Sequence, residues 1–275
     1  MRRLLVALGL LASISSAGAA DYELPTLRGA EPVVPPPRAC CRPWGGFYVG
    51  GQVGYGVASM DFATSTTDLV AHMLRELALE AQVRPSDWQV LGKADVGSGS
   101  YGFFMGYNIE WENLILAFEL NYSRTNFFAD APVSPIGRVV SAGGNTYALT
   151  LTGGASMRIT DMATVRARAG FEIGNFLPYF MIGAAAGRAD LARTATAFGT
   201  ETIPGAPPIV TPFFFTESEV KNGAYIFGWS AGGGLDVMVM PNVFLRGEYE
   251  YVAFSPVWEI KSNVQTVRGG LGFKF

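Results

Sequence analysis

The sequence has little of what metal sites and disulfide-stabilised domains require. Its 275 residues include one histidine, His72, and two cysteines, the adjacent Cys40 and Cys41. Neighbouring cysteines form at best a strained disulfide, and this pair lacks the further ligands of a metal site. We therefore expect no disulfide framework, no metal and no cofactor, and we interpret the two cysteines as incidental or intermolecular thiols.

Charge is also scarce. Charged residues make up 16% of the chain, whereas soluble domains contain about 25%. The formal net charge is −3, so no basic field favours nucleic acid as a partner. Low charge alone does not separate a soluble β-protein from a membrane protein.

The sequence also gives little support for a catalytic site. A serine triad needs a nucleophile, a base and an orienting group within reach of one another. The single histidine, His72, falls in a segment that we predict to be a loop helix. Haem or metal would need a second ligand beside it, so we interpret His72 as an exposed histidine. We predict that the protein is not an enzyme.

The N-terminus resembles an export signal. Arg2 and Arg3 precede an apolar run from Leu4 to about Ile14, and small residues end the segment near Ala20. This pattern predicts a signal peptide over residues 1–20, because the apolar run is too short to span the roughly 30 Å of hydrocarbon in a bilayer. Residues 21–43 contain six prolines, which predicts an extended periplasmic linker.

From Trp44 onward the chain has no long apolar run but repeats segments of alternating hydrophobicity. In Leu114–Ser123 every second residue is apolar, and Glu119 and Asn121 stand between them. Such alternation indicates strands with one apolar and one polar face. Segments of this kind cover residues 46–57, 100–109, 114–123, 164–173, 178–188, 225–237, 243–253 and 267–275, although 178–188 is too uniformly apolar to assign a face.

The connections between these segments alternate in length. Short ones cover 110–113, 174–177 and 240–242, and long ones cover 58–99, 125–145 and 189–223; the fourth long-side connection, 255–262, is short. Short periplasmic turns, long outer loops and an even number of strands are typical of outer-membrane barrels. The sequence therefore predicts an all-β fold, an eight-stranded antiparallel transmembrane β-barrel over residues 44–275. A soluble barrel would place its apolar face inside.

The polar parity of the predicted strands contains five acidic and five basic side chains. We expect them to face the lumen: Glu119, Arg166, Arg168, Glu172, Asp236, Arg246, Glu248, Glu250, Arg268 and Lys274. An eight-stranded barrel is just wide enough for side chains to fill it. A salt-bridged plug is therefore favoured over an aqueous pore, since unpaired charges away from water are costly.

Two outer connections have patterns of their own. Residues 68–82 carry an apolar stripe and end before Pro85, which predicts an amphipathic loop helix that caps the barrel or contacts a partner. Residues 194–220 are rich in proline and phenylalanine for an exposed loop, and we expect them to fold over the mouth beside that helix.

The strands themselves resemble a known family. WGGFYVGGQVGYG, ATVRARAGFEIGNFLPYFMIGAAAG, GWSAGGGLDVMVMPNVFLRGEYEYVAF and the terminal VRGGLGFKF are similar to the small outer-membrane barrels of the opacity-like and outer-membrane immunogenic type. The resemblance implies a surface-exposed barrel in the outer membrane of Gram-negative bacteria, without catalytic residues. It also implies that Leu271, Phe273 and Phe275 form a signal for the outer-membrane assembly machinery. The long first loop departs from the family pattern.

These features predict a non-enzymatic barrel in the bacterial outer membrane that contributes to envelope integrity and to surface recognition through its outer loops. The alternatives are a narrow porin-like diffusion channel for small solutes and a surface adhesin. The expected partners are the lipid bilayer and the assembly machinery, with lipopolysaccharide or a host surface as candidates for the loops.

Overall fold

The computed structural model describes residues 44–75 and 77–275. The predicted signal peptide (1–20), the predicted linker (21–43) and the two cysteines lie outside the described residues. Within the described part, neither the length nor the apolar content of any helix suffices for crossing a membrane.

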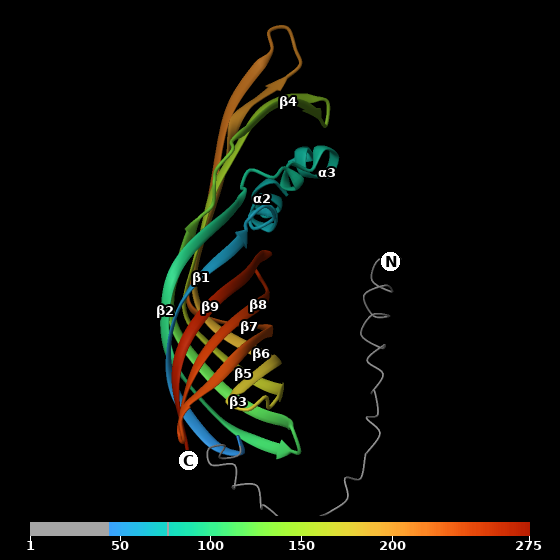
Figure 1. Ribbon diagram of the computed structural model, residues 1–275. Helices are drawn as coiled ribbons and strands as arrows, with labels where there is room; N and C mark the ends of the chain where they lie inside the picture. Colours follow the sequence, from blue (N-terminus) through green and yellow to red (C-terminus); the bar gives the residue numbers. More distant parts are fainter. Residues whose placement is uncertain (1–43, 76) are drawn as a thin grey trace, which may run out of the picture. The chain divides into compact units, whose positions relative to one another are not determined.

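Strands dominate the described residues. They are β1 (Gly46–Asp61), β2 (Lys93–Trp111), β3 (Leu114–Asp130), β4 (Ile136–Ala142), β5 (Asn145–Phe171), β6 (Phe176–Ile203), β7 (Ile209–Met240), β8 (Val243–Val257) and β9 (Ile260–Lys274). All pairings are antiparallel, and β1 pairs with both β2 and β9, so the sheet closes. Strand β3 pairs directly with β5, whereas β4 joins only β5. Eight of the nine described strands thus form a closed ring, which confirms the predicted eight-stranded barrel (Figure 1).

The alternation in the sequence corresponds to the two faces of the ring. On β5, Arg166 and Arg168 are buried in the lumen, while Val165, the residue before Arg166, faces outward with 60% of its surface exposed. Successive side chains of a strand point to opposite faces, so each charged residue in the lumen is followed by one suited to lipid. Segment 178–188, which the sequence leaves unassigned, places Tyr179 and Met181 inside and Phe180 outside.

The outer connections contain far more strand than the sequence pattern suggests. Strands β6 and β7 continue as one hairpin to Ile203 and Ile209, and β4 pairs with the outer part of β5. Figure 1 shows this hairpin, with β4 nearby, continuing past the ends of β8 and β9. Most of the predicted loops 125–145 and 189–223 is therefore an extension of the sheet.

The connection between β1 and β2 carries the helices. The single helix predicted over 68–82 is instead divided into α2 (Thr67–Leu74) and α3 (Ala78–Val83), followed by the 3₁₀ helix η1 (Pro85–Asp87). The backbone is extended at Leu77, which ends the helical run. On either side of this bend, Leu74 of α2 and Leu79 of α3 are both fully buried.

Candidate functional site

The half of the lumen nearer the periplasmic turns is filled by an ion-pair network centred on Glu119 of β3. Its Oε2 accepts hydrogen bonds from Arg168 Nη1 at 2.7 Å, Arg246 Nη1 at 2.7 Å and the Tyr48 hydroxyl at 2.7 Å. Its Oε1 accepts one from Arg166 Nη2. One carboxylate thus binds three guanidinium groups from two other strands, β5 and β8.

Three further carboxylates complete the network. Asp236 lies 2.7 Å from Arg168 Nη2 and 2.8 Å from Arg246 Nε. Glu248 lies 2.8 Å from both Arg166 Nη1 and Arg268 Nη2, and Glu250 pairs with the same two arginines. Four arginines and four carboxylates therefore balance, and their side chains are 0–3% exposed.

Aromatic rings support this network on the periplasmic side. The Tyr179 hydroxyl donates to Glu248 at 2.9 Å, and the Arg168 guanidinium lies 3.7 Å from the centre of the Tyr179 ring. The Arg246 guanidinium lies 4.0 Å from the centre of the Phe104 ring. A guanidinium stacked on an aromatic face gains a cation–π attraction that strengthens where water is excluded. Gly234 makes room here, because a Cβ at that position would lie 2.5 Å from the Tyr179 hydroxyl.

The lumen is layered, and β8 shows the order of the layers. Phe244 belongs to an aromatic cluster at the periplasmic end, and Arg246, Glu248 and Glu250 form the charged layer above it. Val252 belongs to an apolar layer that also buries Met60, Phe62, Leu149 and Leu151. Helices α2 and α3 contribute Leu69, Val70, Leu74 and Leu79 to this layer.

Two of the ten predicted lumen residues lie apart from the arginine–carboxylate network. Lys274 is buried near the periplasmic end, where its Nζ donates to the Gly45 carbonyl at 2.8 Å. Glu172 lies just after β5, at the periplasmic turn. Burial and the neighbouring Glu110 carboxylate raise the pKa of Glu172 above its usual range, although Lys274 opposes the shift.

Several neutral side chains of the lumen were not among the predicted site residues. Gln52 and Asn121 exchange two hydrogen bonds of 3.0 Å, and Gln52 also donates to the Ser123 hydroxyl at 3.0 Å. Tyr48 and Tyr179 hold the carboxylates described above. The parity of the strands could have found Gln52, Asn121 and Tyr48, because each stands on the polar parity of its segment.

Arg193 of β6 joins the helices to the outer hairpin. Although only 3% exposed, it binds Asp68 of α2 through two contacts of 2.7 Å, Glu219 of β7 at 2.6 Å and the Ser65 carbonyl at 2.7 Å. Its guanidinium also lies 4.7 Å from the centre of the Trp258 ring. Burial opposes its charge, but the two carboxylates raise the pKa of Arg193 above its ordinary value. We call this set the Arg193 clamp.

The structure gives His72 a local role at the outer mouth. Its Nδ1 lies 3.1 Å from Glu217 Oε2 of β7, and Arg75 Nη1 lies 2.7 Å from its Nε2. No group of three or more metal-binding side chains occurs among the described residues.

One segment has the spacing of a serine nucleophile. Gly228–Gly232 is GWSAG, which fits the pattern G-x-S-x-G of hydrolases. That motif works at a sharp turn between a strand and a helix. Ser230 instead lies within β7 and is buried in the lumen, and within the described chain its hydroxyl has no hydrogen-bond partner. The match therefore gives no support for catalysis.

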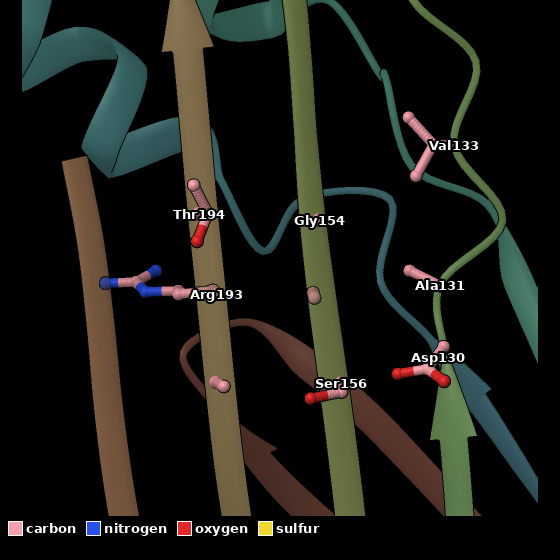
Figure 2. A pocket seen from close by; sticks show the side chains of 9 residues that line it. Asp130, Ala131, Val133, Gly154, Ser156, Arg193 and Thr194 are labelled. Carbon is pink, nitrogen blue, oxygen red and sulfur yellow. The ribbon is translucent and has the colours of Figure 1, made fainter. Parts of the chain in front are cut away.

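A recess of about 330 Å³ lies on the outer face of the barrel, between the end of the β3–β5 pairing and the start of the β4–β5 pairing. Figure 2 shows its lining, with Asp130 on one side and the Arg193 guanidinium pointing away from the recess. Gly154 leaves space there, since a Cβ would meet nothing within 4 Å. Short side chains line most of it, and we assign it no chemistry.

Comparison with known proteins agrees with this architecture. The model of the outer membrane protein beta-barrel domain family matches residues 10–275. The chain is 22% identical over 232 residues to the 25 kDa outer-membrane immunogenic protein of Brucella ovis, covering 84% of this chain and 78% of that protein. The Brucella canis protein of the same name is 23% identical over 240 residues, covering 84% and 79%.

Two solved structures are similar at low identity. Neisserial surface protein A has a TM-score of 0.40 and 16% identity, covering 83% of this chain and 97% of that one. Ail, the attachment invasion locus protein of Yersinia pestis, has a TM-score of 0.33 and 15% identity, covering 83% and 99%. With the family match over nearly its whole length, this chain belongs to the outer membrane protein beta-barrel domain family and is a protein of the bacterial outer membrane.

Proposed function

We propose that this chain is a closed, non-enzymatic outer-membrane barrel that contributes to envelope integrity and presents a folded outer surface for recognition. The observation that carries the proposal is the outer extension, which we define as β4, the outer parts of β5, β6 and β7, and helices α2 and α3. Its apolar side chains pack into the upper layer of the lumen, and its strands continue well beyond the lipid-facing band.

The length of the extension supports a role outside the membrane. On β6 the outward residues are apolar from Phe176 to Ala186, and the strand then continues from Arg188 to Ile203. At about 3.3 Å per residue, these 16 residues extend roughly 50 Å along the strand. The apolar band of such barrels is only about 25 Å tall.

The packing of the extension favours a fixed surface over mobile loops. Its helices bury apolar side chains against the inner face of β5 and β6, and the Arg193 clamp ties α2 to β7. A preorganised surface loses less conformational entropy when it binds a partner. Recognition by the extension is therefore favoured over recognition by disordered loops.

The network in the lumen argues against the alternative of a diffusion channel. A solute would have to displace side chains that are 0–3% exposed and that each form ion pairs with at least two partners. It would then have to cross the apolar layer above them. Breaking a buried ion pair costs about 3–5 kcal/mol. Planar-bilayer recording of the purified barrel should give no large, stable conductance steps, and ion-selective steps in most insertions would overturn the closed-barrel proposal.

Recognition is tested by removing part of the extension. A variant in which a short turn replaces residues 190–222 should still show heat-modifiable migration, because the closed ring keeps its pairings below this point. Its cells should lose attachment to host cells or surface polysaccharide relative to a control that lacks only residues 204–208. Equal attachment by wild type and the large deletion would contradict a recognition role.

The contribution to envelope integrity has a separate test. Cells that lack the protein should become more sensitive to detergent and to bulky antibiotics, and the 190–222 deletion should restore resistance because it retains the barrel. Unchanged sensitivity in cells without the protein would remove this part of the proposal.

A further inference from the structure

The outward residues of three neighbouring strands change from apolar to charged in a single row. The row contains Arg124 of β3, Asp161 of β5 and Arg188 of β6, which are direct cross-strand partners. Towards the periplasmic turns, the outward positions of these strands are apolar or aromatic, for example Ala186 and Tyr122. The row therefore marks the outer boundary of the lipid-facing band on this side of the barrel.

Tyrosines stand at both ends of this row. Tyr101 of β2 pairs with Arg124, and Tyr225 of β7 pairs with Arg188. The two tyrosines are 64% and 72% exposed on the outer wall. Tyrosine is enriched where hydrocarbon meets headgroups, because its ring is apolar and its hydroxyl is polar. The row thus lies at headgroup depth.

Directly below the row the wall is hollowed. Ala163 of β5 and Ala186 of β6 are cross-strand partners, and they lie between Tyr122 on β3 and Phe227 on β7. These two small side chains leave a recess of about 370 Å³, which the Tyr122 and Tyr225 rings also line and which Arg124 and Arg188 border from above. The recess has small apolar side chains at its floor, and its upper rim carries two arginines and one aspartate, a formal charge of +1.

Neither arginine of the row forms a direct ion pair with the aspartate between them, although both charges act on its carboxylate. The Asp161 carboxylate accepts hydrogen bonds from the Tyr122 hydroxyl at 2.6 Å and the Thr160 hydroxyl at 2.8 Å. Among the described residues, no carboxylate oxygen lies within 4.0 Å of the Arg124 or Arg188 nitrogens. Arg188 extends over β7, where its Nη2 would lie 3.3 Å from a Cβ on Gly223.

We propose that this recess is a binding site for a phosphorylated glycolipid of the outer leaflet. Arg124 and Arg188 bind the headgroup phosphate, since guanidinium groups form strong charge-assisted hydrogen bonds with phosphate oxygens. An acyl chain lies over Ala163 and Ala186. The site opens sideways on the lipid-facing wall, and this favours a lipid that approaches within the leaflet over a free anion.

The test measures lipid retention by the full-length barrel. Phosphatidylcholine nanodiscs containing the wild-type protein are titrated with bisphosphorylated lipid A, and retention is read by native mass spectrometry. The double variant Arg124→Gln/Arg188→Gln should weaken binding about tenfold or more, because a basic residue near an anionic lipid surface contributes about 1 kcal/mol. Arg158→Gln is the matched control: Arg158 is an outward arginine of β5 whose guanidinium lies 4.8 Å from the centre of the Phe128 ring.

Further arms separate the phosphate from the acyl chain. Ala186→Trp fills the recess without changing charge and should also weaken binding, while heat-modifiable migration reports that each variant is folded. Dephosphorylated lipid A should bind at least tenfold more weakly than the phosphorylated form. Equal binding of the two forms, equal binding by the double variant and Arg158→Gln, or displacement of the lipid by millimolar inorganic phosphate would overturn the proposal.

Discussion

At the scale of single residues, Glu119 has the most connected side chain of the charged layer. It contacts three arginines and one tyrosine, and all of these partners come from other strands. A buried guanidinium that loses its carboxylate keeps its desolvation cost without the compensating attraction. The layer is therefore stable only as a complete set.

Glu119→Gln tests this dependence. The amide keeps the shape of the side chain but leaves an excess positive charge in the lumen, so we expect the free energy of unfolding to fall by about 3 kcal/mol. Urea unfolding in phospholipid vesicles, followed by tryptophan fluorescence, measures it. Asp130→Asn is the control, because Asp130 is exposed on the same strand; a loss no greater than that of the control would contradict a stabilising network.

At the periplasmic turn, ionisation of Glu172 makes the stability of the folded protein depend on pH. Its pKa is raised in the folded protein by burial and by Glu110, so ionisation of Glu172 opposes folding. This cost is complete above the raised pKa and disappears below the ordinary carboxyl pKa. Glu172→Gln should therefore be more stable than wild type at pH 8, and the difference should vanish near pH 4. Urea midpoints at both pH values decide this, and a variant less stable at pH 8 would reverse the sign.

At the scale of elements, the strands of the ring could be predicted because lipid and lumen impose opposite demands on neighbouring positions. Val165, Arg166, Ala167 and Arg168 alternate for that reason. Above Arg188 the contrast between the faces weakens: buried alanines of β6 alternate with partly exposed threonines, as in Ala195–Thr196, and neither residue is strongly apolar or charged. The sequence pattern therefore predicts loops where the structure has the outer strands. The break between α2 and α3 depends on burying Leu79 against distant strands, which local periodicity does not encode.

The Arg193 clamp holds α2 in place by contacts between elements distant in sequence. Arg193→Ala should release the helix while the ring stays closed, since Asp68 and Glu219 lose their shared partner. Hydrogen bonds to charged groups contribute about 1.5–3 kcal/mol, so opening of residues 62–92 should increase about tenfold. Proteinase K digestion of intact cells measures the cleavage rate, with Arg158→Ala as the control; equal rates would show that the helix is held by its apolar face alone.

At the scale of the whole barrel, closure depends on the pairing of the first strand with the last. The pairing runs from Tyr48–Lys274 to Asp61–Lys261, and the Phe275 amide adds a bond of 2.9 Å to the Phe47 carbonyl. The Phe275 ring faces outward, is 67% exposed and contacts Phe47 and Phe273. It therefore adds little packing inside the barrel.

Deletion of Phe275 should impair assembly in cells more than it lowers the stability of the refolded protein. We expect the assembly machinery to read this terminal aromatic residue, whereas its exposed ring leaves few contacts to lose in the folded barrel. The measurements are the heat-modifiable fraction in membranes and the urea midpoint after refolding. Phe171→Ala removes an outward phenylalanine at the same end of the barrel; an equal assembly defect in this control would argue against a terminal signal.

On a cell, the outer extension is the part of the chain that we expect an antibody to reach. At the tip of the β6–β7 hairpin, residues 204–208 lie outside the paired strands. The faces of the sheet beside this tip combine side chains from β5, β6 and β7. Antibodies against those faces depend on the folded sheet and lose their epitope when the protein is boiled. An antibody against 204–208 reads one continuous stretch of chain and retains its epitope in denatured protein.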